Sequence, residues 1–256
     1  MKIKEICPIC LKEAGGHLLQ NSSNENYYGF TEYSDLKDYQ TFKCGNNHTF
    51  YAVYRRPDYT FLFDDSIKSF KNGYYYESIA TAYSAYERFN RIVVLAMIYS
   101  ETKDISKTDE IFKNNKRNST IIEGMAQTNL ESKFEITAKP HSKLKKIRND
   151  TLHGYQIASK DNAKKVMIYV FQYINEIELK FQQMNDENQY FLTSYYNKRI
   201  SMLKNLKSST ELFKDSLIDN VNSASVISPD INRTTFSDSE DELFDQILNY
   251  KYINAY

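Results

Sequence analysis

An arginine and a histidine near the middle of the chain form its most informative pair of residues. Arg148 and His153 are separated by four residues, and Gly154 and Tyr155 follow the histidine. The planar guanidinium of an arginine keeps its charge and binds phosphate oxygens as a fork. The imidazole of a histidine has a pKa that suits proton transfer near neutral pH. Together these two side chains are sufficient for cutting RNA, so this segment is the candidate catalytic site.

The spacing of these residues predicts how a helix would present them. Asn149 and His153 are four positions apart, so a helix projects both from one face. Arg148 lies off that row by more than about a third of a turn. One continuous helix therefore aims Arg148 and His153 at a common point only imperfectly, and a second copy of the chain is expected to complete the site. Gly154 is expected to end the helix as a C-cap.

The segment resembles the signature of the HEPN superfamily, whose catalytic members carry an arginine and a histidine four to six residues apart on a helical bundle. The form R-N-D-x-x-H-G is matched residue for residue by Arg148, Asn149, Asp150, His153 and Gly154. Residues 76–89 are also similar to the first long helix of the family, on which a polar or acidic residue faces the site. Glu87 is the candidate for that position. The resemblance covers about residues 64–185.

The resemblance implies a metal-independent endoribonuclease that works as a homodimer, with the motif helices facing each other across the two-fold axis. It implies that His153 is the general base or acid, that Arg148 stabilises negative charge and that Asn149 orients groups by hydrogen bonding. A toxin or anti-phage defence effector is the implied biological role, with an antitoxin or another operon partner left open. The alternative is a non-catalytic module that binds nucleic acid or nucleotides and dimerises, as some HEPN domains do.

Tyr155 extends the resemblance by one position. The form R-x4-H-x-Y occurs in HEPN toxins whose partner nucleotidyltransferase antitoxins adenylylate the tyrosine. Tyr155 is therefore a candidate modification site, although it is one of 22 tyrosines in the chain.

The segment around the motif is rich in basic residues, although the whole chain of 256 residues has a formal net charge of zero. A neutral chain has no global field that attracts nucleic acid or membranes, so any such binding must be local. Asp150 and Asp161 are the acidic residues that oppose the basic ones within the segment. The basic residues around the motif are Lys139, Lys143, Lys145, Lys146, Arg148, Lys160, Lys164 and Lys165. The candidate RNA contacts are Lys143, Lys145 and Lys146, although each also fits a solvated helix face.

The three cysteines of the chain fall into a pattern that is typical of a zinc site. Cys7 and Cys10 form a C-x2-C pair. Cys44 and His48 form a C-x3-H pair in a turn that joins two β-prone runs, which is the pattern of a hairpin. Two close pairs of such ligands suit one tetrahedral Zn²⁺ ion, with structural zinc rather than an open catalytic position. His17 is an alternative fourth ligand. The alternative to a metal site is a set of three unrelated thiols and a surface histidine. An odd number of cysteines fits a reducing compartment better than a disulfide framework.

Residues 1–60 are predicted to form this small β-rich zinc ribbon, and residues 64–217 to form an antiparallel HEPN-like helical bundle, so the fold class is mainly α. Apolar residues recur at helical spacing over residues 74–99 and 163–183, and shorter helices are expected at 119–132 and 141–153. Residues 220–256 are predicted to be a polar linker and a short amphipathic helix that packs on its own bundle, on a partner or over the basic face. Because neither a signal peptide nor an apolar run of membrane-spanning length is apparent, a cytoplasmic location is expected.

Overall fold

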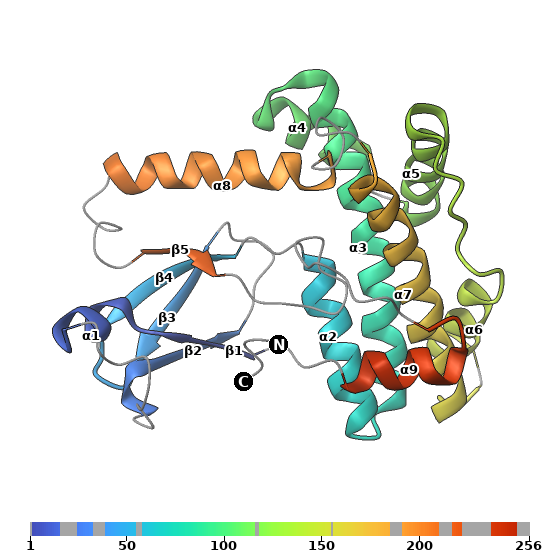
Figure 1. Cartoon of the computed structure of the whole chain (residues 1–256), viewed down its shortest axis with the longest axis horizontal. Coiled ribbons are helices and arrows are strands. Elements are labelled where there is room, and N and C mark those ends of the chain that lie inside the picture. Colours follow the sequence, from blue (N-terminus) through green and yellow to red (C-terminus); the bar gives the residue numbers. More distant parts are fainter. Residues whose placement is uncertain are drawn as a thin grey trace. The chain divides into compact units, whose positions relative to one another are not determined.

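A computed structural model of the chain is mainly helical, with a small N-terminal sheet (Figure 1). The chain forms two compact units, which consist mainly of Met1–Arg55 with Tyr196–Asn222 and of Arg56–Tyr195 with Ser223–Ala255. Residues 196–209 and 217, which were predicted to lie in the bundle, thus belong to the unit that contains the sheet. The structure describes residues 2–15, 25–32, 39–54, 58–115, 118–154, 156–184, 191–209, 217–221 and 237–249.

The first unit is built on a five-stranded sheet whose strands follow the order of the sequence. Strands β1 to β4 pair antiparallel, whereas β5 pairs parallel to β4. Helix α1 follows β1 directly and has Pro8 in its first turn, where the missing N–H costs nothing. The elements are β1 (Lys2–Ile6), α1 (Pro8–Glu13), the 3-10 turn η2 (Glu25–Tyr27), β2 (Tyr28–Glu32), β3 (Gln40–Cys44), β4 (Thr49–Tyr54) and β5 (Leu217–Val221).

One face of the sheet forms the core of this unit. In β3, Gln40, Phe42 and Cys44 are buried, and the two residues between them are exposed. This alternation follows from the two-residue period of a strand. The ring of Phe42 stacks on that of Phe50 with 5.1 Å between the centroids. The three cysteines of the chain lie in the same apolar cluster.

The second unit is helical, with α3 at its centre. Helix α3 packs against α2, α4, α5, α6 and α7, and the residues that it buries repeat along one broad stripe. Helix α8 begins in this unit, and its residues from Tyr196 onward belong to the first one. The helices are α2 (Asp58–Lys71), α3 (Tyr75–Thr102), α4 (Ile105–Asn115), α5 (Ser119–Phe134), α6 (Leu144–Leu152), α7 (Lys160–Gln182), α8 (Phe191–Ser209) and α9 (Glu240–Asn249).

Some helix ends differ from the predicted ones by a few residues, and side-chain caps mark the first turns of two helices. Helix α5 is capped by Asn118, whose Oδ1 accepts the N–H groups of Thr120 and Ile121 at 2.9 and 3.4 Å. Helix α7 starts at Lys160 because the hydroxyl of Ser159 accepts the N–H of Asn162 at 3.1 Å. Each cap satisfies a donor that the first helical turn leaves unpaired.

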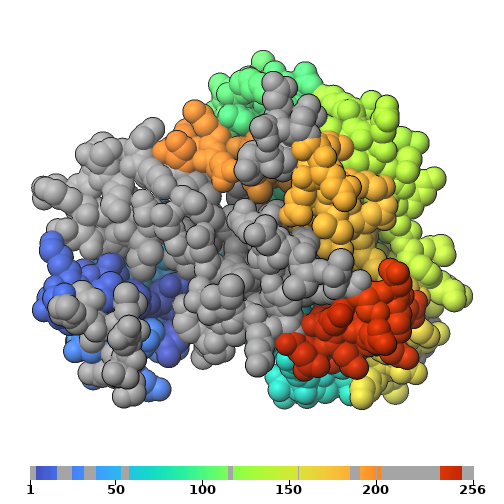
Figure 2. Space-filling view, in the orientation of Figure 1, coloured from blue at the N-terminus to red at the C-terminus, as the bar shows by residue number. Residues whose placement is uncertain are grey.

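Helix α9 lies on the outside of the helical unit (Figure 2), where it contacts α2 and α7. Leu243, Phe244 and Ile247 are its buried residues, and the ring of Phe244 meets that of Phe70 at 4.9 Å between centroids. The amphipathic segment predicted near the C-terminus therefore packs on its own bundle. Most of the predicted linker, residues 222–236, lies outside the described residues. No helix in the described ranges combines the length and the apolar character that crossing a membrane requires.

Candidate functional site

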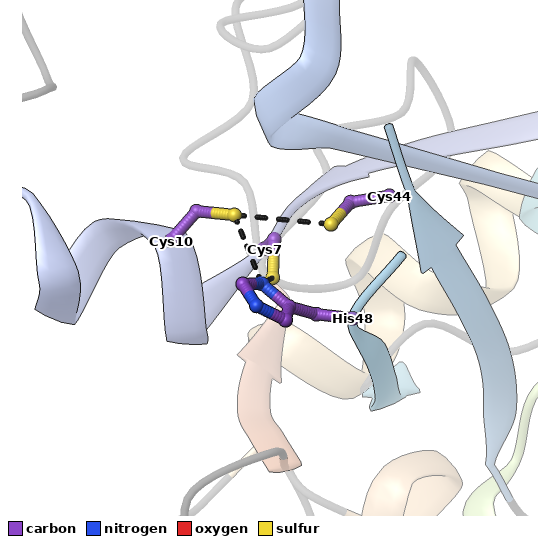
Figure 3. Close-up of side chains that lie close together, drawn as sticks. All are labelled: Cys7, Cys10, Cys44 and His48. Atoms are coloured by element: carbon purple, nitrogen blue, oxygen red, sulfur yellow. Dashed lines mark hydrogen bonds between the residues drawn. The ribbon is translucent and has the colours of Figure 1, made fainter. Parts of the chain in front are cut away.

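Four metal-ligating side chains converge in the first unit (Figure 3). The three thiol sulfurs and the His48 ring nitrogen all lie within 4.8 Å of one another. The Sγ of Cys10 is 3.8 Å from the Sγ of Cys44 and 3.2 Å from Nδ1 of His48. Tetrahedral zinc with Zn–S bonds of about 2.3 Å separates two sulfurs by about 3.8 Å. Cys7, Cys10, Cys44 and His48 therefore form a buried group with the size and the ligand chemistry of a zinc site.

Two tight turns bring these ligands together. Cys7 immediately precedes α1, and its carbonyl accepts the N–H of Leu11 at 3.0 Å. Between β3 and β4, the N–H of Cys44 donates to the carbonyl of His48 at 3.1 Å. Asn47 adopts the left-handed conformation in this second turn, with φ of 65°, which an asparagine tolerates better than most residues. The predicted hairpin turn thus places one ligand at each of its ends.

Hydrogen-bond donors surround the sulfur atoms. The backbone N–H groups of Cys10 and Ile9 donate to the Sγ of Cys7. The side-chain amide of Asn46 donates to the Sγ of Cys10 at 3.3 Å. Burial outweighs these donors and raises the pKa of the Cys7 thiol to about 12. A metal that binds here must therefore displace a proton from that thiol, and the donors then stabilise the thiolate.

The imidazole of His48 is held from both sides. Its Nδ1 faces the sulfurs, whereas Nε2 lies 3.8 Å from an Oε1 of Glu13 in α1. A carboxylate behind a ligating histidine fixes the ring orientation and makes the ring a stronger ligand. The sequence pattern did not single out Glu13 or Asn46, because neither belongs to a ligand pair. The alternative ligand His17 lies outside the described residues.

The arginine of the motif is anchored in the second unit. Arg148 is half-buried on α6, and its Cζ lies 5.0 Å from the centroid of the Tyr83 ring on α3. Its Nη1 donates to the Oδ1 of Asn149 at 2.9 Å. Its Nε is buried and has no hydrogen-bond partner in the part of the chain that the structure describes. The guanidinium is thus held by an aromatic face and one hydrogen bond, with donor capacity left over.

The histidine of the motif is exposed at the end of the same helix. His153 is the C-cap of α6, and its backbone N–H donates to the carbonyl of Asn149 at 3.0 Å. Its ring makes no hydrogen bond or ion pair with any described residue. Among the described residues, Arg148 and His153 therefore make no hydrogen bond to each other within one chain. Such an arrangement leaves the imidazole free to bind a ligand or a group from another molecule.

Gly154 follows the C-cap rather than forming it, which corrects the expectation from the sequence. Its φ lies outside the left-handed region, unlike those of Gly15 and Gly73. A Cβ at this position would lie 2.4 Å from the carbonyl oxygen of Asp150. Glycine is thus required here because the backbone passes too close to the last turn of α6 for any side chain. The next residue, Tyr155, lies outside the described residues.

A buried layer of tyrosines lies beneath Arg148. Burial, together with the negative charges of Glu87 and Glu123, raises the pKa of Tyr83 to about 12, and the positive charge of Arg148 opposes this shift. Glu87 therefore lies close enough to the ring beneath Arg148 to act on it electrostatically. Tyr86 and Tyr173 continue the layer, and the Tyr173 hydroxyl donates to Asn90 at 2.9 Å. In the sequence, Tyr83 and Tyr86 fall in an apolar helical stripe and indicate only packing.

Two lysines of the predicted basic patch have acidic partners. Lys145 Nζ lies 2.9 Å from an Oε1 of Glu123 on α5, and Lys164 is paired with Asp241 on α9. Acidic residues from outside the segment therefore oppose the basic ones in addition to Asp150 and Asp161. The two partners are remote in sequence and are brought in by helix packing. Lys143 and Lys146 are exposed.

A comparison with protein-family models, with curated proteins and with solved structures gave no match for this chain.

Proposed function

We propose that the chain is a metal-independent endoribonuclease of the HEPN type and acts as a toxin or anti-phage defence effector. The observation that carries this proposal is the difference between the surroundings of two residues of one short helical segment. Arg148 is anchored against Tyr83 and keeps unused donors, whereas the His153 ring is exposed and unpaired among the described residues. A fixed cation and a free imidazole are what phosphodiester cleavage needs.

The reaction follows from these two groups. His153 takes the proton from a ribose 2′-hydroxyl, and that oxygen attacks the adjacent phosphorus. The 5′-oxygen of the next nucleotide leaves and takes a proton from water, which yields a 2′,3′-cyclic phosphate and a 5′-hydroxyl. Arg148 stabilises the negative charge that develops on the phosphoryl oxygens, and Asn149 orients it through their hydrogen bond. Glu87 and Arg148 both act electrostatically on Tyr83, so Glu87 lies near the proposed site.

A homodimer supplies the arrangement that one chain lacks. The proposed dimer places two copies of α6 face to face, so that Arg148 of one chain serves the same phosphate as His153 of the other. The exposed Lys143 and Lys146 then extend the groove along the RNA backbone. An antitoxin or another operon partner would restrain such an enzyme, and Tyr155 is the residue proposed for modification.

Cleavage of single-stranded RNA tests the proposal. The wild-type chain is expected to cleave in EDTA and to leave 5′-hydroxyl ends, and either Arg148→Ala or His153→Ala should lower the rate at least about a hundredfold. Zinc content is measured in the same samples, because EDTA must not strip the metal centre. His141→Ala is a matched control, since His141 is an exposed histidine three residues before α6 that stacks on Tyr169. Equal rates for His153→Ala and His141→Ala would refute the catalytic role.

Mixing of variants tests the composite site. Arg148→Ala and His153→Ala chains, each inactive alone, should regain cleavage when they are mixed, because a mixed dimer contains one complete Arg148–His153 pair across its interface. Light scattering should show a dimer at micromolar concentration. A monomer that cleaves RNA at full rate would contradict the dimeric site while leaving the ribonuclease assignment intact.

A non-catalytic module that binds nucleic acid or nucleotides and dimerises is the second candidate. It is favoured because Arg148 and His153, as described, make no hydrogen bond to each other within one chain. This alternative predicts that RNA binds without being cut, both in the wild-type chain and in the mixture of variants.

We also propose that Cys7, Cys10, Cys44 and His48 bind one structural zinc ion. The ion would supply folding energy to the first unit and would take no part in cleavage, because protein ligands fill all four tetrahedral positions. The distances between the four ligand atoms support this assignment.

A further inference from the structure

The face of the sheet opposite the metal centre carries aromatic rings and lysines in register. Antiparallel pairing places Lys4 opposite Phe30, Phe30 opposite Lys43, and Lys43 opposite Thr49, so these four residues form one row across β1 to β4. Paired residues of a sheet point to the same side. The next row on one side of it contains Tyr28, and the next row on the other side contains Tyr51. The buried residues Phe42, Cys44 and Phe50 alternate with them and point the other way.

This outer face is open to solvent. Phe30 is 54 % exposed, and Lys43 and Thr49 are exposed as well. A phenylalanine usually buries more of its ring than this, because transfer of apolar surface out of water is favourable. The exposed ring therefore contributes little to the core of the unit. Tyr28 and Tyr51 are half-buried.

One lysine of this face is already in contact with two of its rings. Lys4 Nζ lies 4.1 Å from the centroid of Tyr28 and 5.5 Å from that of Phe30. An ammonium group at such distances is drawn to the ring faces and is kept at the level of the rings. None of the side chains that the structure describes on this face is acidic. These side chains are Lys4, Ile6, Tyr28, Phe30, Thr41, Lys43, Thr49 and Tyr51.

We propose that this face binds single-stranded RNA, with bases stacked on Phe30 and Tyr28 and phosphates bound by Lys4 and Lys43. Stacking requires unpaired bases, because the rings of a duplex are already stacked on one another. The positive charge of the described side chains complements phosphates, and it favours nucleic acid over an apolar protein surface. The choice of RNA rather than DNA rests on the proposed ribonuclease function. The face would hold a single-stranded substrate independently of the groups that cut it.

Binding is measured with a ligand that cannot be cleaved. The probe is a fluorescently labelled 12-nucleotide 2′-O-methyl oligouridylate, because methylation removes the attacking hydroxyl. Fluorescence anisotropy with the full wild-type chain should show binding that weakens steeply with salt, and weaker binding of the same strand when it is paired to its complement.

Variants of one row locate the binding surface. Phe30→Ala should weaken binding about 5- to 100-fold through the loss of one stacked base. Lys43→Ala should weaken binding and flatten the salt dependence, because one phosphate contact is lost. Thr49→Ala is the matched control: it lies in the same row, is exposed and has neither a ring nor a charge. Phe30→Tyr should retain wild-type affinity, and zinc content and thermal unfolding verify the fold of each variant.

The outcomes separate this inference from the proposed function. Equal affinities for Phe30→Ala, Lys43→Ala and Thr49→Ala would overturn the binding face, even if the wild-type chain cleaves RNA. Loss of self-association in Phe30→Ala, without any effect on oligouridylate binding, would overturn it in favour of a protein contact. Conversely, Phe30-dependent binding by a chain that never cleaves RNA would support the face and refute the ribonuclease.

Discussion

The guanidinium of Arg148 lies over the ring of Tyr83, with 5.0 Å between Cζ and the ring centroid. The two residues come from different helices, α6 and α3, that are separated by 65 positions in the sequence. Tyr83 is only 7 % exposed, so its ring is fixed in the bundle and cannot follow a moving side chain. The contact therefore restricts where a mobile arginine can place its charge. In the proposed mechanism, Tyr83 is a positioning residue for Arg148.

Replacement of Tyr83 by leucine is expected to slow RNA cleavage by roughly 2- to 30-fold, since a cation–π contact contributes about 0.5–2 kcal/mol. Tyr83→Phe keeps the ring and should retain the wild-type rate within about twofold. Rates are compared at a temperature at which circular dichroism shows every variant to be folded.

Tyr86→Leu is the matched control for this prediction. Tyr86 is also buried on α3 and contacts the ring of Tyr83. Its replacement should lower the melting temperature without a comparable loss of cleavage. A uniform loss in both leucine variants, with no rescue by Tyr83→Phe, would mean that the ring serves only the packing of the bundle.

The two neighbouring lysines of α6 are expected to differ in what they do. Lys145 neutralises Glu123, whose side chain is only 12 % exposed, so Lys145→Ala should lower the free energy of unfolding by roughly 0.5–1 kcal/mol. Lys146 is exposed, and Lys146→Ala should leave stability within about 0.5 kcal/mol of the wild type. RNA binding by Lys146→Ala should weaken, and the slope of log affinity against log salt should fall by about 1.

Denaturant unfolding and salt-dependent anisotropy measure the two effects separately. The opposite pattern, with stability lost in Lys146→Ala and RNA affinity unchanged, would remove Lys146 from the proposed RNA groove.

The elements that depend on local pattern could be predicted from the sequence. The C-x2-C and C-x3-H pairs indicated the four residues of the candidate metal site, because each pair needs only one tight turn to bring its side chains together. Long apolar stripes predicted α3 and α7 to within a few residues. Cys44 and His48 in particular are joined by backbone hydrogen bonds within a single turn.

Contacts between helices could not be predicted in this way. The pairing of Lys145 with Glu123 and of Lys164 with Asp241 depends on how helices distant in sequence pack. The same holds for Tyr83, whose position in an apolar stripe gives no sign that it lies beneath an arginine. Gly154 was expected to serve helix capping, whereas its role is set by the approach of the Asp150 carbonyl oxygen.

Metal removal is expected to affect the first unit and to spare the second. Protein purified without added zinc should contain about one zinc ion per chain. Cys44→Ser should unfold the sheet while the helical bundle keeps its circular dichroism signal, because the metal supplies folding energy only locally. Zinc affinity should fall as the pH falls, since thiols and the imidazole must lose protons to bind the ion.

Glu13→Gln offers a milder test of the same centre. The Glu13 carboxylate lies 3.8 Å from Nε2 of His48, so its neutralisation should weaken zinc binding about 10- to 100-fold while leaving the four ligands in place. Competition with a chromogenic chelator measures this affinity. A folded sheet without any bound metal in the wild-type protein would contradict the assignment.

Two glycines in helical surroundings should respond to alanine in opposite directions. A Cβ on Gly154 would lie 2.4 Å from the carbonyl oxygen of Asp150, so the end of α6 must move to accept it. Gly154→Ala is therefore expected to destabilise the protein by about 1–3 kcal/mol. It should also slow cleavage, because His153 is the adjacent residue. Gly124 lies within α5, and a Cβ added there would meet no atom within 4 Å, so Gly124→Ala should stabilise by about 0.5–1 kcal/mol.

Chemical denaturation of the two alanine variants, followed by RNA cleavage at a temperature at which both are folded, separates the effects. Gly124→Ala should cleave at the wild-type rate, which shows that a changed stability alone does not alter activity. Gly154→Ala should remain slow even when it is fully folded, because its defect is the displacement of His153 from the end of α6. If Gly154→Ala were as stable and as active as Gly124→Ala, the close approach to Asp150 would not determine where the histidine lies, and the proposed geometry of the site would fail.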